Sequence, residues 1–143
     1  MRNGQDEKAI AAFSEAIQYD PANYSAYTNR GGLYLSLGRF DEAIGDFTAA
    51  IRLQPEQGRS YSNRARANRR KGDHQAAIAD YTKAIELDPN LGAAFFYRGE
   101  SHFALGEYQQ AIADYSAALK INKKDRQAKQ RRKQAQALLK GGG

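Results

Sequence analysis

The stretch from Tyr24 to Gln57 reads YSAYTNRGGLYLSLGRFDEAIGDFTAAIRLQPEQ, and its pattern returns along the whole chain. Proline recurs every 34 residues, at Pro21, Pro55 and Pro89. Columns of glycine, alanine and aromatic residues keep the same spacing: Gly4, Gly38, Gly72 and Gly106; Ala9, Ala43, Ala77 and Ala111; Ala16, Ala50, Ala84 and Ala118; Phe13, Phe47, Tyr81 and Tyr115. Several independent columns with one period predict a repeat protein.

Each repeat is predicted to be a pair of helices. In the quoted stretch, apolar side chains from Tyr24 to Leu37 recur at helical spacing. Gly38 should end this first helix, because glycine readily takes a left-handed conformation. A second apolar face runs from Phe40 to Ile51, and Pro55 closes it because proline cannot continue a helix interior. One such pair cannot bury its apolar face alone, so the sequence predicts an all-α solenoid (α-solenoid) of stacked antiparallel pairs.

These columns resemble the tetratricopeptide repeat (TPR) family. The family's pattern of aromatic, small, aromatic, alanine, aromatic and proline residues is matched, with gaps, at these positions: Tyr27, Gly31, Tyr34, Ala43, Phe47 and Pro55; Tyr61, Ala65, Ala77, Tyr81 and Pro89; Phe95, Gly99, Ala111 and Tyr115. The resemblance implies a right-handed superhelical array whose concave surface is lined by the first helix of each pair. It implies a protein-protein interaction scaffold, and it says little about the partner.

The register of the repeat predicts a single domain over residues 1–140. This domain consists of a half repeat at 1–23 with its helix from Asp6 to Asp20, full repeats at 24–57, 58–91 and 92–125, and a capping helix at 126–140. Residues 141–143 are all glycine and are predicted to be a disordered tail.

The composition excludes several classes of protein. The chain of 143 residues has no cysteine, which excludes disulfides, thiolate metal sites and thiol catalysis. No apolar run approaches the roughly 20 residues of a membrane helix, and the N-terminus lacks the apolar core of a signal peptide. We therefore expect no membrane insertion and a cytoplasmic location. The net charge of +6 is concentrated from Lys123 onward, where eight basic residues and one acidic residue stand.

The sequence predicts no enzyme, no cofactor and no metal site. A catalytic nucleophile needs a base within hydrogen-bond reach. The two histidines, His74 and His102, fall in different repeats and in columns that otherwise hold packing residues. No glycine-rich phosphate loop follows a predicted strand.

The resemblance places ligand contacts on the first helix of each pair. Carried across to this chain, the groove columns give a basic middle wall and an aromatic last wall, and the predicted peptide-binding residues are Asn29, Arg59, Asn63, Arg66, Arg69, Arg70, Phe96 and Tyr97. Arginine binds carboxylates with a planar fork, and buried aromatics often anchor a partner. We therefore expect a peptide with acidic residues and one apolar or aromatic anchor. The alternative is that the arginines are merely solvated and the aromatics pack on the following helix.

A second arginine column is expected to be structural. Three arginines are each followed by an aspartate 16 residues later: Arg30 and Asp46, Arg64 and Asp80, Arg98 and Asp114. We expect an ion pair that joins the two helices of a repeat. The half repeat has Ala12 in the aspartate column, and Arg132 continues the arginine column into the cap. Forward pairing of Asp114 with Arg132 is therefore the alternative.

One TPR subclass grips the C-terminal carboxylate of a peptide with lysines, asparagines and an arginine. Here Asn29, Asn63 and Arg59 fall in matching columns, but the other clamp positions hold Thr28, Gly32, Ala93 and Tyr97. The clamp is incomplete, so this mode of binding is not predicted.

Two further functions stay as alternatives. The basic run from Lys123 to Lys133 could bind nucleic acid or another anionic surface without sequence preference, although no aromatic residues interleave with it for base stacking. The apolar face of Ile10, Phe13 and Ile17, which lacks a covering helix in the predicted half repeat, could form a homodimer.

Overall fold

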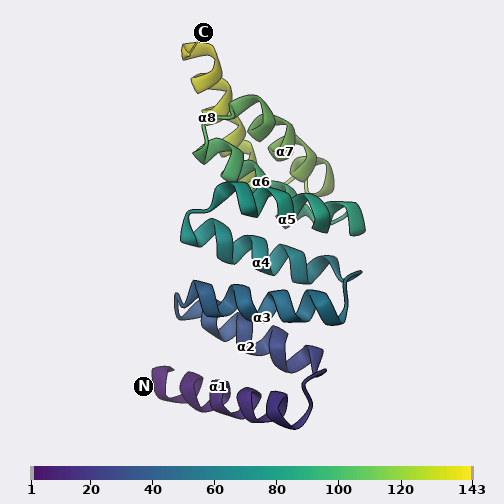
Figure 1. Cartoon of the computed structure of the whole chain (residues 1–143). Coiled ribbons are helices and arrows are strands. Elements are labelled where there is room, and N and C mark those ends of the chain that lie inside the picture. Colours follow the sequence, from purple (N-terminus) through teal and green to yellow (C-terminus); the bar gives the residue numbers. More distant parts are fainter. Residues whose placement is uncertain (1, 143) are drawn as a thin grey trace.

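The computed structural model describes residues 2–142, which form eight α-helices and no strand (Figure 1). The helices are α1 (Arg2–Tyr19), α2 (Tyr24–Ser36), α3 (Phe40–Leu53), α4 (Gly58–Lys71), α5 (His74–Leu87), α6 (Gly92–Ala104), α7 (Tyr108–Ile121) and α8 (Arg126–Gly141). The all-α prediction is confirmed. None of these helices is long and apolar enough to cross a membrane.

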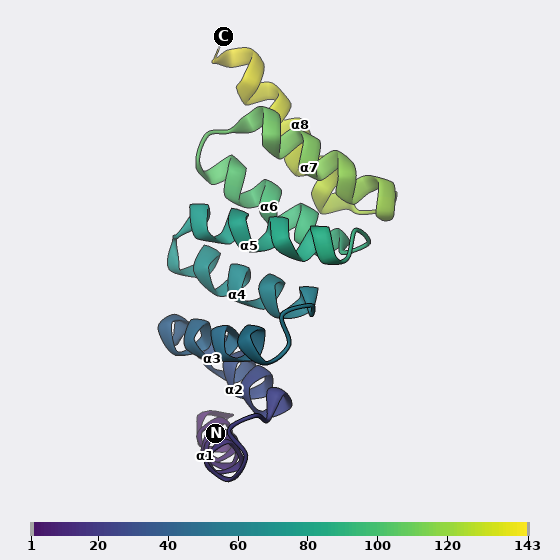
Figure 2. The same ribbon diagram turned by 45° about the vertical axis from the view of Figure 1, so that its right-hand side comes forward.

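The helices form one continuous stack. Each helix packs on the next along the chain, and the two ends of the chain lie at opposite ends of the stack in both views (Figures 1 and 2). No sheet or second layer of core is added to this stack within the described residues. The arrangement confirms an α-solenoid of consecutive helix pairs.

Glycine ends the first helix of each pair, as predicted. Gly38, Gly72 and Gly106 have φ angles of 75°, 99° and 76°, and they are the glycines with positive φ in the described chain. Gly4 shares their column but lies inside α1, which begins at Arg2 rather than near Asp6. The column therefore encodes a turn only where a helix precedes it.

The C-terminal helix also differs from expectation at its end. We expected disorder from residue 141, but α8 continues through Gly141, and Gly142 keeps a right-handed helical conformation. The backbone N–H of Gly142 donates to the carbonyl of Leu138 at 3.0 Å, which extends the helical hydrogen bonding. Gly143 lies outside the described residues.

Small residues allow the helices of a pair to approach closely. Phe47, Tyr81 and Tyr115 are at most 1% exposed, and each lies under the first helix of its own pair. A Cβ atom added to Gly31 would stand 2.9 Å from Cε1 of Phe47, and one added to Gly99 would stand 2.9 Å from Cε1 of Tyr115. These glycines therefore set how deeply the aromatic rings are buried.

Candidate functional site

The first helices of the pairs lie closer together than the second helices. Helix α2 contacts α4, and α4 contacts α6, whereas α3, α5 and α7 make no comparable contact with one another in the described part of the chain. In a curved stack the more closely spaced layer lies on the inner side. We therefore call the surface formed by α2, α4, α6 and α8 the groove.

The predicted structural arginine column joins the two helices of each pair. Nε and Nη2 of one arginine donate to both carboxylate oxygens of the aspartate, at distances of 2.7–2.9 Å, in three equivalent places: Arg30 and Asp46, Arg64 and Asp80, Arg98 and Asp114. The hydrogen bond to aspartate raises the pKa of Arg30 and of Arg64 above the ordinary value. The ion pair within each pair of helices is confirmed.

The third guanidinium nitrogen of this column bonds to the preceding pair. Nη1 donates to a hydroxyl 16 residues earlier in every case: Arg30 to Ser14, Arg64 to Thr48, Arg98 to Thr82, and Arg132 to Ser116. Asp114 therefore pairs with Arg98 and not with Arg132, which removes the forward alternative. Each arginine ties its own pair to the one before it.

The arginines on the groove side of α4 are differently placed. Arg59, Arg66, Arg69 and Arg70 have no carboxylate partner within residues 2–142, and Arg59 and Arg66 are exposed. Nη1 of Arg70 donates to the carbonyl of Leu35 at 2.9 Å, and its guanidinium lies 5.0 Å from the centre of the Phe40 ring. Arg70 is thus partly engaged between repeats, and Arg59, Arg66 and Arg69 are left for a ligand.

Arg69 connects the basic wall to the aromatic wall. Its guanidinium lies 4.7 Å from the centre of the Tyr97 ring, and the Tyr81 ring stacks beside Tyr97 at a centroid distance of 6.5 Å. Nε of Arg69 and the hydroxyl of Tyr81 are both buried without a hydrogen-bond partner among the described residues. Burial raises the pKa of Tyr81 to about 12. The cation of Arg69 therefore rests on an aromatic platform that leaves its remaining N–H groups uncommitted.

A polar hollow opens between α2 and α4. It is lined by Tyr24, Thr28, Gln57, Arg59 and Asn63. The hydroxyl groups of Tyr24 and Ser60 form a hydrogen bond of 2.7 Å across the two helices. Arg59 and Asn63, two predicted binding residues, thus share one depression. Asn29 is exposed on α2 and does not line it.

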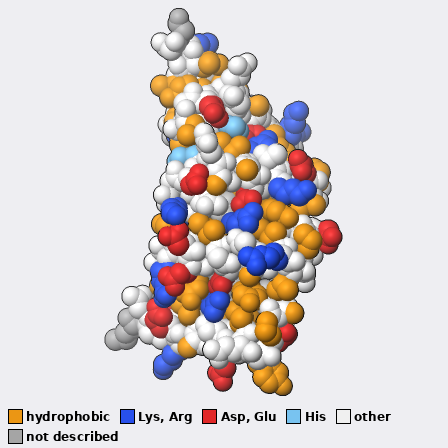
Figure 3. Space-filling view, viewed as in Figure 1, with side chains coloured by type: hydrophobic (Ala, Val, Ile, Leu, Met, Phe, Trp, Pro, Cys, Tyr) orange, Lys and Arg blue, Asp and Glu red, His pale blue; other side chains and the backbone are white. Residues whose placement is uncertain are grey.

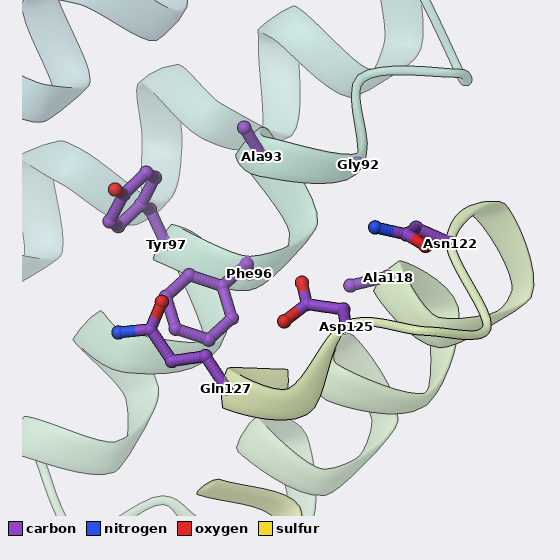
Figure 4. Close-up of a pocket in the computed structure, with 8 residues that line it drawn as sticks. All are labelled: Gly92, Ala93, Phe96, Tyr97, Ala118, Asn122, Asp125 and Gln127. Atoms are coloured by element: carbon purple, nitrogen blue, oxygen red, sulfur yellow. The ribbon is translucent and has the colours of Figure 1, made fainter. Parts of the chain in front are cut away.

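A second hollow opens between α6 and the start of α8 (Figure 4). It is lined by Gly92, Ala93, Phe96, Tyr97, Ala118, Asn122, Asp125 and Gln127. In the close-up the Phe96 ring lies between the side chains of Gln127 and Asp125, and Tyr97 projects from the opposite side of α6 from Asp125. The structure therefore brings Phe96 and Tyr97 together at one depression, with polar groups from the capping helix around it.

Phe96 belongs mostly to the core. It is 6% exposed, and its ring packs against Tyr97 and Tyr115 at centroid distances of 5.2 and 5.7 Å. Phe103 is covered by Arg131, whose guanidinium lies 3.9 Å from the ring centre. Only the edge of Phe96 and the partly exposed Tyr97 are offered to a ligand.

A carboxylate closes the far end of the groove. Glu100 accepts a hydrogen bond from the hydroxyl of Tyr115 at 2.5 Å and another from Nε of Arg131 at 2.6 Å. Burial and this bond to Glu100 raise the pKa of Tyr115. The acid in the aromatic wall is thus neutralised by the cap, and the α4 arginines keep their uncompensated charge.

The comparison with family models identifies the chain. The tetratricopeptide repeat model matches residues 1–58, 33–92 and 63–129. The chain belongs to the tetratricopeptide repeat family. The comparison with curated proteins finds no match.

Solved TPR structures resemble this chain over most of its length. The crystal structure of MamA aligns with a TM-score of 0.89 at 25% identity, covering 94% of this chain and 78% of that one. The first TPR of Spaghetti (RPAP3), bound to the HSP90 peptide SRMEEVD, aligns with a TM-score of 0.79 at 26% identity, covering 81% and 92%. The TPR2B domain of yeast Sti1, in a pHsp70 complex, aligns with a TM-score of 0.75 at 30% identity, covering 80% and 96%.

Several groove residues of this TPR chain escaped the sequence prediction. Tyr24 stands in a column with Gly58 and Gly92, and this departure from glycine was the available signal for a side chain that enters the groove. Gln127 and Arg131 were assigned to a solvating cap, yet they border the aromatic wall. The capping helix therefore forms a fourth wall of the groove.

Proposed function

We propose that this TPR chain is a protein-protein interaction scaffold that binds an acidic peptide along the groove. Acidic side chains of the peptide lie over Arg59, Arg66 and Arg69, and an apolar side chain sits at the hollow beside Phe96 and Tyr97. The observation that carries the proposal is the lack of carboxylate partners for the α4 arginines, when the arginines between the helices all have one. Binding, and not catalysis, is the function proposed.

The contacts within the molecule support this assignment of roles. Arg69 is held against Tyr97, so less of its conformational freedom is lost when it binds a carboxylate. Arg59 and Arg66 are exposed, so each of their ion pairs with a ligand contributes only about 1 kcal/mol or less. Several such pairs together give charge specificity and faster association, and the hollow beside Phe96 supplies an apolar contact.

Two TPR relatives were solved with chaperone peptides, and one of those peptides carries two glutamates and an aspartate. For this chain we propose recognition of internal acidic side chains, because Thr28, Gly32, Ala93 and Tyr97 replace the usual clamp residues. Amidation of the peptide's C-terminus should then change its affinity little.

The test is a titration of labelled acidic peptides, each with one phenylalanine at a different position, together with SRMEEVD. The Arg66→Glu/Arg69→Glu variant should bind the best peptide at least about tenfold more weakly, because attraction becomes repulsion at two contacts. The matched control is Arg52→Glu/Lys120→Glu, which makes the same charge change at exposed positions on α3 and α7. Equal binding by the two double variants, or no binding by any peptide, would contradict the proposal.

The same titration separates the competing hypotheses. Helix α8 carries Arg126, Lys129 and Lys133 around a shallow depression and has no acidic residue. An anionic polymer bound there would respond to salt but not to the α4 charge reversal. Self-association through α1 would respond to neither, and it would show as a rise in mass with protein concentration.

A further inference from the structure

The outer face of α1 repeats a packing surface that every other second helix has covered. In α3, α5 and α7 this surface consists of two alanines and an aromatic ring, at most 3% exposed. The same columns in α1 hold Ala9, Phe13 and Ala16, and all three are partly exposed. Within residues 2–142 no helix lies on this side of α1, whose only strong contact is with α2. The face thus continues the interface of the stack without an occupant.

The covered pairs show which side chain an occupant needs over Phe13. The ring of Phe47 lies under Gly31, and the ring of Tyr115 lies under Gly99. A Cβ atom at either glycine would stand 2.9 Å from the ring, and the equivalent position over Tyr81 holds Ala65. A helix that covers Phe13 in the same way therefore needs glycine or alanine above the ring.

The same pairs show which charge an occupant must lack. The residue before the small residue is an arginine, and its carboxylate partner stands one position before the aromatic ring. In α1 this partner is replaced by Ala12, and the nearby hydroxyl of Ser14 is already bonded to Arg30. An arginine brought against Ala12 would be buried without a partner, which is strongly unfavourable. The occupant therefore carries an uncharged side chain at that position.

A second copy of this chain does not meet these requirements. The first helices α2, α4 and α6 already cover their own partners, and α8 is the one whose corresponding face is open. In α8 the two decisive columns hold Arg132 and Lys133. Head-to-tail stacking would place Lys133 over Phe13 and Arg132 over Ala12, so it is opposed at both positions.

We propose that the outer face of α1 binds an α-helix of another protein. That helix presents glycine or alanine over Phe13, preceded by an uncharged residue over Ala12. The bound helix would complete the first pair of the stack and bury Ala9 and Ala16 as Ala43 and Ala50 are buried in α3. This surface is separate from the groove, so the proposal does not depend on the peptide-binding function.

The probe is a helix-constrained peptide with the sequence of residues 24–37, checked for helicity by circular dichroism. The Arg30→Ala peptide should bind the chain at least about tenfold more tightly than the unsubstituted peptide, because the latter buries an unpaired cation. The doubly substituted Arg30→Ala/Gly31→Leu peptide should not bind measurably. In the chain, Ala12→Asp should reverse the preference, so that the unsubstituted peptide binds more tightly.

The Arg66→Glu/Arg69→Glu variant is the control, and it should bind the Arg30→Ala peptide as the unsubstituted chain does. Failure of that peptide to bind, or a preference that Ala12→Asp leaves unchanged, would overturn the proposal. Dimerisation of the chain that is lost in Phe13→Asp would also overturn it, because a second copy would then be the occupant.

Discussion

The arginines between the helices and the arginines on the groove side of α4 are the same side chain in two different settings. Arg64 has a bidentate aspartate, a hydroxyl from the preceding pair, and a side chain 24% exposed. Arg66, two residues later, is exposed and has no carboxylate partner in the described chain. The difference shows that the charge on α4 serves the fold on one face and stays available on the other.

The surface of the stack extends the comparison. On the face drawn in Figure 3, acidic and basic side chains stand next to one another, with hydrophobic side chains between them. Exposed pairs such as Arg39 with Glu42 and Lys71 with Asp41 compensate one another. Uncompensated arginines are thus a local property of α4 and not a general consequence of the basic composition.

The largest effect should come from removing the partner of an interior arginine. Asp80→Ala leaves Arg64 between α4 and α5 without its carboxylate, and we expect a loss of about 3 kcal/mol in the free energy of unfolding. Arg66→Ala is the matched control and should change this free energy by no more than about 0.5 kcal/mol. Urea unfolding followed by circular dichroism measures both. Similar losses for the two variants would remove the distinction between the two sets of arginines.

A smaller effect should come from the link between successive pairs. Thr82→Val removes the hydroxyl that accepts from Nη1 of Arg98 at 3.0 Å, and we expect a loss of about 1 kcal/mol. Thr28→Val is the control, because its exposed hydroxyl bonds only to Ser25 of its own helix. The same unfolding measurement applies. If Thr82→Val proves as stable as the control, the hydroxyl column does not tie the pairs together.

The smallest effect concerns a core group beneath the groove. Burial raises the pKa of Tyr81 from 10.0 to about 12, so the folded state favours the neutral phenol. The resulting contribution to stability is complete below pH 10 and is lost as the pH rises toward 12. The difference in tyrosinate absorbance between the unsubstituted chain and Tyr81→Phe should show this late titration while circular dichroism still reports a helical protein. A titration at the ordinary pKa would mean that the groove side is open to water at Tyr81.

The period of the sequence was enough to predict the helix pairs, their turns and the interior ion pairs. Each of these depends on residues that repeat every 34 positions and on contacts that repeat with them. The ends were harder to predict, because Gly4 and Gly141 lie where the column has no neighbouring helix to give it meaning.

The groove was predicted less completely, for a different reason. A column number places a residue on a face, but it does not say where a long side chain reaches. Arg70 bonds to Leu35 in the preceding pair, and Arg131 reaches back to Glu100. Phe96 was assigned to the groove, and most of its ring packs against Tyr115 instead. The role of the predicted binding residues stays a prediction until a ligand is measured.

The hydrogen bond between Tyr24 and Ser60 has a mechanical consequence for the groove. It spans 36 residues of sequence and joins two neighbouring first helices, so it resists bending between the first two pairs. The same column holds Gly58 and Gly92 farther along, where no side chain can make such a brace. We therefore expect the polar half of the groove to be stiff and the aromatic half to be compliant. A ligand would then meet a preset curvature at one end and adjust the pitch of the coil at the other.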